Sequence, residues 1–215
     1  MLSIQIPTIV SRSHVFKPLL AELKRQSEPF GDKIEILHLT DEKEMPIAQK
    51  RTELYEMSSM PYSVQWDDDD WIHPIGINLI MNALLSKPDC VTYKMISEFD
   101  GIPQKRQPGN LHRTIFRRKY KKAARNVDGF DTVHPPCNKN VIRTDLAIKA
   151  SKMLPQTQRY GEDGDFAKEV VRLVKKEIFI DKHIYWYLNL SGEKWSRERY
   201  GLSENDLFNE PSQLI

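Results

Sequence analysis

Apolar residues along the chain follow two patterns in turn, one with the period of a strand and one with the period of a helix. Residues 2–10 are rich in Ile and Val, and a helical pattern from Val15 to Leu23 follows, with Ser11 and Ser13 as candidate caps. The predicted strands are residues 2–10, 33–39, 62–66, 90–96 and 178–190. The predicted helices are the Val15 segment, 46–58, a segment from Pro74 to Leu84, 143–150 and 163–175. The repeated order of strand then helix predicts an α/β fold.

Residues 100–101, an Asp-Gly pair, predict a hairpin turn that joins strand 90–96 to a short strand at 102–106. The sheet is therefore expected to be mixed. A chain of 215 residues is long enough for one sizeable core. We expect one domain over residues 1–190, followed by a polar tail or linker at 191–215.

Composition narrows the class of protein. The chain has two cysteines, and its first residues lack a basic start followed by a long apolar stretch. No window approaches the roughly 20 apolar residues that cross a bilayer. These features predict a soluble, cytoplasmic protein without a membrane span. The net charge of +2 identifies no partner, but the segment 104–125 contains nine Lys or Arg and no acidic residue.

Four consecutive aspartates, Asp67 to Asp70, directly follow the predicted strand 62–66. Adjacent carboxylates repel one another unless a cation or several hydrogen-bond donors offset the repulsion. In extended backbone, Asp67 and Asp69 would project together and form a two-carboxylate clamp. Mg²⁺ or Mn²⁺ accepts such a clamp together with phosphate oxygens. The alternative is a solvated acidic turn.

The segment VQWDDDDWIHP resembles the Asp-x-Asp-Asp motif of the family 2 glycosyltransferases, which have the GT-A fold. Asp67, Asp69, Asp70 and Pro74 match its fixed positions. The resemblance implies a three-layer α/β/α GT-A fold with a central mixed, mostly parallel sheet. It also implies that Asp67 serves the ribose and the water shell of the metal, that Asp69 ligates the metal, and that Asp68 lies in the donor site.

Upstream segments resemble other parts of the same family pattern. IQIPTIVSR matches the first strand, so Pro7 and Thr8 are expected near the nucleotide base. Asp41, at the end of the second predicted strand, takes the place of the base-binding aspartate, although the usual motif is missing. Lys50 and Arg51 precede the position where Thr52 replaces the family's Asn, and these two cations could reach a diphosphate. The alternative for both is an exposed charge pair on a helix.

Downstream, RYGEDGDF resembles the family's Glu-Asp motif at a helix start, which makes Asp163 the general base with Glu162 beside it. An ordinary acidic cap is the alternative. His183 lies where many GT-A enzymes carry a last metal ligand, and the alternative is a buried strand histidine. His134 is a weaker rival for that position.

The resemblance implies an inverting, Mn²⁺- or Mg²⁺-dependent transfer from a nucleotide-sugar, most commonly a UDP-sugar, to a glycan or glycoprotein. Size and Lys-rich composition are also similar to glycosyltransferases of large DNA viruses. The basic segment 104–125, with Phe116 and Tyr120 interleaved, leaves two alternatives: transfer to modified DNA bases, or a non-enzymatic module that binds polyanions. The sugar-nucleotidyltransferases are a rival enzyme class, but residues 2–16 lack the glycine-rich loop that they usually carry.

Overall fold

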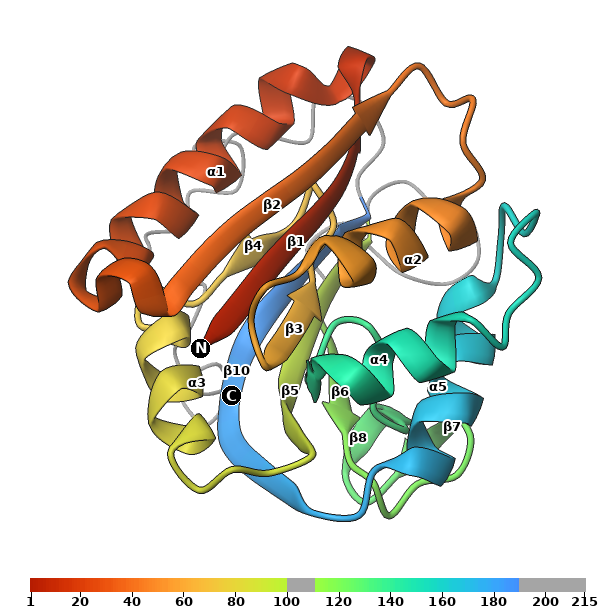
Figure 1. Cartoon of the computed structure of the whole chain (residues 1–215). Coiled ribbons are helices and arrows are strands. Elements are labelled where there is room, and N and C mark those ends of the chain that lie inside the picture. The colour runs from red at the N-terminus through yellow and green to blue at the C-terminus, as the bar shows by residue number, and fades with distance from the viewer. Residues whose placement is uncertain (100–110, 190–215) are drawn as a thin grey trace.

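The computed structural model describes residues 1–99 and 111–189, and a ten-stranded sheet runs through this part of the chain (Figure 1). Its strands are β1 (Leu2–Ile9), β2 (Ile34–Asp41), β3 (Tyr62–Gln65), β4 (Trp71–Ile72), β5 (Cys90–Phe99), β6 (Leu111–Phe116), β7 (Ala124–Val127), β8 (Phe130–His134), β9 (Val141–Arg143) and β10 (Glu177–Asn189). The order is β2-β1-β3-β9-β5-β6-β8-β7, and β10 pairs with β5 and β4. β1, β2, β3, β5 and β10 run in one direction, whereas β9 runs the opposite way between β3 and β5.

Helices cover both faces of the sheet. They are α1 (Ser13–Ser27), α2 (Ile47–Met57), α3 (Gly76–Leu84), α4 (Thr144–Ser151) and α5 (Glu162–Leu173), with short 3-10 segments η1 (Val10–Arg12) and η2 (Glu28–Lys33). α1 and α3 bury their apolar residues in one hydrophobic cluster with β1, β3 and β10. α2, α4 and α5 contribute to a second cluster, and Figure 1 shows them on the opposite side of the sheet. This arrangement confirms the expected three-layer α/β/α fold with a mixed central sheet.

The register of the first strands determines where the acidic run lies. β1 pairs in parallel with β2 from Leu2 opposite Ile34 to Ile9 opposite Asp41. β1 also pairs in parallel with β3, starting from Leu2 opposite Tyr62. The carboxyl-terminal ends of these three strands therefore meet at one edge of the sheet, where ligands bind in open α/β folds. Residues 67–70 follow β3 at that edge.

All five predicted strands and all five predicted helices are present, with boundaries that differ by a few residues. Two details of the predicted helices are wrong. α1 has Arg12 at its N-cap position and no side-chain cap, so neither Ser11 nor Ser13 caps it. Arg143, predicted to start a helix, ends β9 because β9 pairs with β3 and β5. The predicted hairpin turn, the strand at 102–106 and the tail at 191–215 lie outside the described residues.

Five strands were not predicted from the sequence: β4, β6, β7, β8 and β9. Each is two to six residues long, and pairing with a neighbour, rather than a hydrophobic run of its own, defines it. Both cysteines, Cys90 and Cys137, are buried and free. Among residues 1–99 and 111–189, every helix is too short or too polar to cross a membrane.

Candidate active site

The acidic run lies beside the end of β1. Thr8 donates its hydroxyl hydrogen to the Asp68 carboxylate at 2.6 Å. The run does not continue β3, because the Asp70 N–H donates to the Asp67 carbonyl at 3.3 Å and closes a turn. The prediction of extended backbone through Asp67 and Asp69 is therefore wrong, although both residues line one cavity. The turn directs the side chains of the run toward different partners.

Asp67 is neutralised by two buried cations. Arg51 Nη2 lies 2.8 Å from one oxygen of Asp67, and Lys139 Nζ lies 2.7 Å from the other. Burial by itself raises the pKa of Asp67, but the charges of Lys139 and Arg51 outweigh this effect and hold that pKa well below its ordinary value. Asp67 is therefore ionised at neutral pH.

Asp68 and Asp69 share a different cation. Arg12 Nη1 lies 2.9 Å from Asp68 and 3.4 Å from Asp69. Burial raises the pKa of Asp68, although Thr8 and Arg12 oppose the rise. The two residues therefore depend on Arg12, at the start of α1, for compensation of their charge.

Asp70 faces away from the other three and anchors β10. It accepts hydrogen bonds from the Tyr185 hydroxyl and, at 2.8 Å, from the Leu188 N–H. Burial, together with the charges of Asp67 and Asp69, raises the pKa of Asp70 well above its ordinary value. Tyr185 also accepts the Asp67 N–H at 3.0 Å, so the turn is tied to β10 at both ends.

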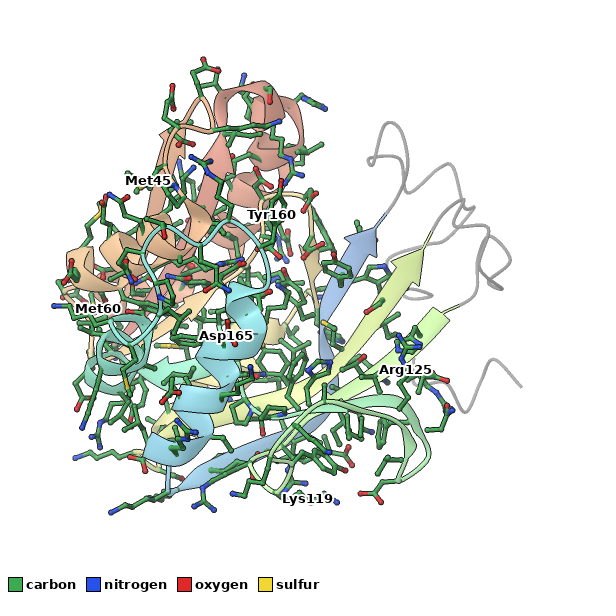
Figure 2. The ribbon with its side chains drawn as sticks, turned by 90° about the vertical axis from the view of Figure 1, so that its right-hand side faces the viewer. Met45, Met60, Lys119, Arg125, Tyr160 and Asp165 are labelled. Atoms are coloured by element: carbon green, nitrogen blue, oxygen red, sulfur yellow. The ribbon has the colours of Figure 1, made fainter. Side chains whose placement is uncertain are left out.

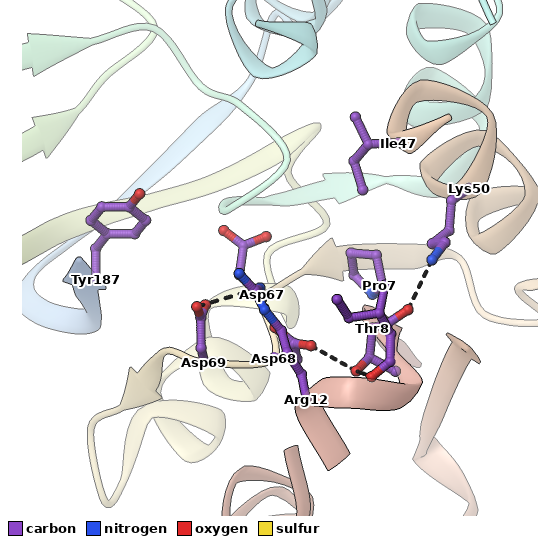
Figure 3. Close-up of a pocket in the computed structure, with 10 residues that line it drawn as sticks. Pro7, Thr8, Arg12, Ile47, Lys50, Asp67, Asp68, Asp69 and Tyr187 are labelled. Carbon is purple, nitrogen blue, oxygen red and sulfur yellow. Dashed lines mark hydrogen bonds and ion pairs between the residues drawn. The ribbon is translucent and has the colours of Figure 1, made fainter. Parts of the chain in front are cut away.

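A cavity of about 350 Å³, called here the first cavity, opens beside the acidic run (Figure 3). It is lined by Pro7, Thr8, Ile9, Arg12, Ile47, Lys50, Asp67, Asp68, Asp69 and Tyr187. Six of the residues predicted for the donor and metal sites are thus brought together from β1, α2 and the turn after β3.

Of the residues predicted to bind the diphosphate and the base, Lys50 lines the first cavity and Asp41 does not. Lys50 lines the first cavity and donates to the Thr8 carbonyl at 2.8 Å. Asp41 is absent from the lining and instead pairs with Lys50. Asp41 also accepts the Met45 N–H at 2.8 Å. In this structure Asp41 therefore positions Lys50.

Arg51 joins the two acidic motifs. Besides Asp67, it contacts Glu162 at 3.2 Å and Asp163 at 3.6 Å. Lys139 contacts Asp67 and, at 3.4 Å, Asp163. Burial raises the pKa of Asp163, but Lys139 and Arg51 overcome this effect and lower that pKa below its ordinary value. Arg51 is therefore a buried bridge, absent from the first-cavity lining.

A larger cavity of about 670 Å³, called here the second cavity, adjoins the first. It is lined by Asp67, Met95, Ser97, His112, Thr114, Phe116, Ala123, Ala124, Arg125, Thr132, His134, Cys137, Lys139, Asp163, Gly164, Ala167 and Tyr187. Asp67 and Tyr187 line both cavities. The side chain of Asp163 is 41% exposed, although its Oδ1 atom is buried, and Oδ2 lies 3.4 Å from Lys139 Nζ.

The fold is shared with solved structures, although no protein-family model and no curated protein sequence matches the chain. S. aureus TarS matches with a TM-score of 0.62 and 14% identity, over 90% of this chain and 37% of TarS. S. aureus TarS 1-349 in complex with UDP-GlcNAc matches with a TM-score of 0.58 and 14% identity, over 89% of this chain and 59% of that one. The fold is of the GT-A type.

A putative glucose-1-phosphate thymidylyltransferase from Bacillus anthracis also matches, with a TM-score of 0.50 and 9% identity, over 86% of this chain and 88% of that one. The present chain spans less than two thirds of the TarS chains that it matches. The GT-A fold is thus common to proteins of different reaction classes, and the reaction has to be argued from the site.

The two histidines occupy different environments. His134 lines the second cavity. His183 is buried and lines neither cavity, and its ring nitrogens have no hydrogen-bond partner in the described part of the chain. Burial and the nearby cations Lys94 and Arg113 lower the pKa of His183 to about 4, so the ring is neutral. Its role as a metal ligand stays a prediction.

The donor atoms in the first cavity suit a hard divalent cation. Asp67, Asp68 and Asp69 are oxygen ligands, which Mg²⁺ and Mn²⁺ prefer. Within residues 1–99 and 111–189, no three His, Cys, Asp or Glu residues are grouped closely enough to hold a metal by themselves. One or two carboxylates with phosphate oxygens and waters is the set that Mg²⁺ commonly takes, so the residues fit an ion that arrives with a nucleotide.

Three residues of the site were not predicted: Arg12, Lys139 and Tyr187. Arg12 follows the Pro-Thr strand end closely enough for that motif to have indicated it. Lys139 and Tyr187 are 72 and 120 residues from Asp67, in segments with no recognisable motif. Only the tertiary structure brings them to the acidic run.

The basic segment is partly used within the fold. Arg117 contacts Glu177, Arg118 donates to the Val174 carbonyl, and Lys119 pairs with Asp128. Lys119 and Arg125 lie on the outside of the molecule at the β7–β8 end (Figure 2). Residues 104–110 of the segment lie outside the described residues.

Proposed function

We propose that the protein is a glycosyltransferase that moves a sugar from a nucleotide-diphosphate sugar to a hydroxyl group of a glycan or glycoprotein. The observation that carries the proposal is the pair of adjoining cavities, which share Asp67 and Tyr187. Displacement with inversion needs the leaving group and the acceptor on opposite sides of the anomeric carbon. A donor in the first cavity and an acceptor in the second would meet at the shared wall.

A uridine nucleotide is the proposed donor. S. aureus TarS 1-349, which shares this fold, forms complexes with UDP and with UDP-GlcNAc. In the present chain, Pro7 and Thr8 at the end of β1 would face the base, and Lys50 would face the diphosphate. Lys50 lines this cavity with its ammonium group held by Asp41 and the Thr8 carbonyl, and it would add a positive charge for phosphate oxygens.

The metal would be Mn²⁺ or Mg²⁺, held by Asp69 with Asp67 on the donor side. When bound, such an ion stabilises negative charge on a departing diphosphate without a proton donor. The protein's own contribution is to hold these carboxylates in a turn that Tyr185 and Thr8 fix in place. His183 is retained as a third predicted ligand, to be tested by substitution.

Asp163 is the proposed general base. Its carboxylate removes the proton of the acceptor hydroxyl while that oxygen bonds to the anomeric carbon and the bond from that carbon to the diphosphate oxygen breaks. Glu162 sits beside it and is held by Arg51. Ser97, Thr114 and Thr132 are hydroxyl-bearing residues in the lining of the second cavity, and Tyr187 is an aromatic one. Polar groups of this kind, with an aromatic surface, suit a sugar acceptor.

Calorimetric titration of UDP and the other nucleoside diphosphates, with and without Mn²⁺, tests the donor site. We expect Mn²⁺-dependent binding of UDP that Asp69→Ala abolishes. Asp165→Ala, a carboxylate on α5 that pairs with Lys168, is the matched control and should bind normally. His183→Gln tests the predicted third ligand, since loss of Mn²⁺-dependent binding in that variant would support it. Absence of binding to any nucleotide would contradict the proposal.

Product analysis separates the rival enzyme class. A glycosyltransferase releases UDP from a UDP-sugar, and slowly transfers the sugar to water when no acceptor is present. A nucleotidyltransferase instead joins UTP and a sugar 1-phosphate with release of pyrophosphate. Formation of pyrophosphate from UTP, without release of UDP from UDP-sugars, would indicate a nucleotidyltransferase.

A further inference from the structure

Arg12 occupies an unusual position in the first cavity. It ends η1 immediately after β1, so its backbone is fixed by the strand end and by the start of α1. Its guanidinium lies within ion-pair distance of both Asp68 and Asp69, and its side chain is part of the cavity wall (Figure 3). The proposed metal site and this arginine therefore use the same carboxylates.

Exposure differs sharply within this cluster. The Asp68 and Asp69 side chains are 2% and 7% exposed, whereas the side chain of Arg12 is 45% exposed. Thr8 holds the Asp68 carboxylate at 2.6 Å. The Asp68 carboxylate is thus held by Thr8 as well as by Arg12, and the long, half-exposed arginine is the partner that can move without disturbing the core.

A divalent cation on Asp69 and the guanidinium of Arg12 cannot share these carboxylates without repulsion between them. A nucleoside diphosphate resolves that conflict, because its oxygens offer Arg12 a second anionic partner in the same cavity. Arginine binds phosphate through two parallel hydrogen bonds, a geometry that its planar group favours.

We propose that Arg12 is an exchangeable counter-cation of the donor site: it pairs with Asp68 and Asp69 in the absence of ligand and moves its ion pair to the diphosphate when metal and nucleotide bind together. This inference rests on the proposed donor site. It predicts that metal and nucleotide bind cooperatively, since metal alone must displace Arg12 whereas metal with diphosphate gives it a new partner.

The first test compares the binding of Mn²⁺ alone to the wild type and to Arg12→Ala. Electron paramagnetic resonance of the free Mn²⁺ measures this binding. Removal of the competing cation should tighten Mn²⁺ binding by about 5-fold or more, the lower end of common coupling factors. Arg12→Lys keeps the charge and should bind Mn²⁺ as weakly as the wild type. Arg172→Ala removes an exposed arginine from an ion pair on α5 and is the matched control.

The second test is titration of UDP at saturating Mn²⁺. Arg12→Ala should bind UDP at least about 5-fold more weakly, and Arg12→Lys should lie between it and the wild type, because lysine lacks the two-pronged geometry. Thermal denaturation of each variant confirms that it is folded. Unchanged or weaker Mn²⁺ binding by Arg12→Ala, or no Mn²⁺ binding by either protein, would overturn the inference. Failure of the wild type to bind any nucleotide would instead count against the proposed function, and the Mn²⁺ comparison would still test the competition.

Discussion

Neighbouring carboxylates of one turn are neutralised in opposite ways. Asp67 is held by Arg51 and Lys139, both with side chains less than 10% exposed. Asp68 and Asp69 are held by Arg12, whose side chain is nearly half exposed. Removing one partner of a buried ion pair leaves an uncompensated charge, whereas a partner that is itself half exposed can be replaced by water or by another cation. The contrast separates two groups of cations. Arg51 and Lys139 form a buried framework beside both cavities, whereas Arg12 is a half-exposed cation in the wall of the first cavity.

The buried framework also explains why the two acidic motifs act at one place. Arg51 on α2 and Lys139, in the turn before β9, each contact Asp67 and Asp163. The Lys139 carbonyl accepts a hydrogen bond from Tyr93, which in turn accepts one from Trp66 at 3.1 Å. Asp67 and Asp163, the proposed general base, are therefore positioned by contacts that extend into the core.

The largest expected effect is on kcat, when Asp163 is substituted. Asp163→Asn removes the proposed general base and should lower kcat by about 10²–10⁴-fold. Affinity for UDP with Mn²⁺ should change little, because Asp163 lines the second cavity and is absent from the first. Steady-state kinetics and calorimetry measure the two quantities. Asp165→Asn, in the same helical turn, is the control, and an equal loss of activity in it would contradict the assignment.

The free energy of unfolding tests directly whether the buried framework and Arg12 differ. Lys139→Met leaves Asp67 and Asp163 with Arg51 as their shared cation and should lower the free energy of unfolding by about 3–5 kcal/mol. Arg12→Met should lower it by less, because the Arg12 side chain is 45% exposed and water can take the place of its guanidinium beside the two carboxylates. Urea denaturation of both variants gives the comparison. Similar losses in the two would remove the distinction between framework and exchangeable cation.

The pH dependence of activity sharpens the role of Lys139. A general base works in its deprotonated form, and Lys139 and Arg51 lower the pKa of Asp163. Wild-type kcat/KM should therefore persist to lower pH than an ordinary aspartate with a pKa near about 3.9 would allow. Lys139→Gln removes one of these charges, so the acidic limb of the profile should move to higher pH. An unmoved limb would show that Asp163 is not the titrating base.

The smallest effect is expected at the exposed part of the basic segment. Lys121→Ala with Lys122→Ala should change the free energy of unfolding by less than about 0.5 kcal/mol per site, because both side chains are exposed. Donor turnover should be unaffected. Fluorescence anisotropy with a short DNA duplex at two salt concentrations tests the polyanion alternative. Strong salt-dependent binding that this double variant abolishes, without any need for Mn²⁺, would favour that alternative.

Much of the fold was predictable because its information is local. β1 and β10 are rich in Ile and other apolar residues, β3 alternates apolar and polar residues, and α3 and α5 carry their apolar residues at helical spacing. The short strands β7, β8 and β9 have no such pattern. β7 and β8 pair with each other in a hairpin around Asp128 and Gly129, and β9 pairs with β3 and β5, which are distant in sequence. The absence of these three short strands from the prediction left the wall of the second cavity undescribed.

The site, too, was predictable only where its information is local. The sequence by itself determined that an acidic run follows a buried strand at the ligand-binding edge, and that a Glu-Asp pair begins a later helix. It could not determine which way each aspartate points, because the hydrogen bond from Asp70 to Asp67 turns the backbone. The tertiary structure alone decided the cations: Lys139 reaches Asp67 across 72 residues, a contact that depends on how the turn before β9 packs against the end of β3. Charge compensation in a buried site is a property of distances in space, and spacing along the chain does not encode it.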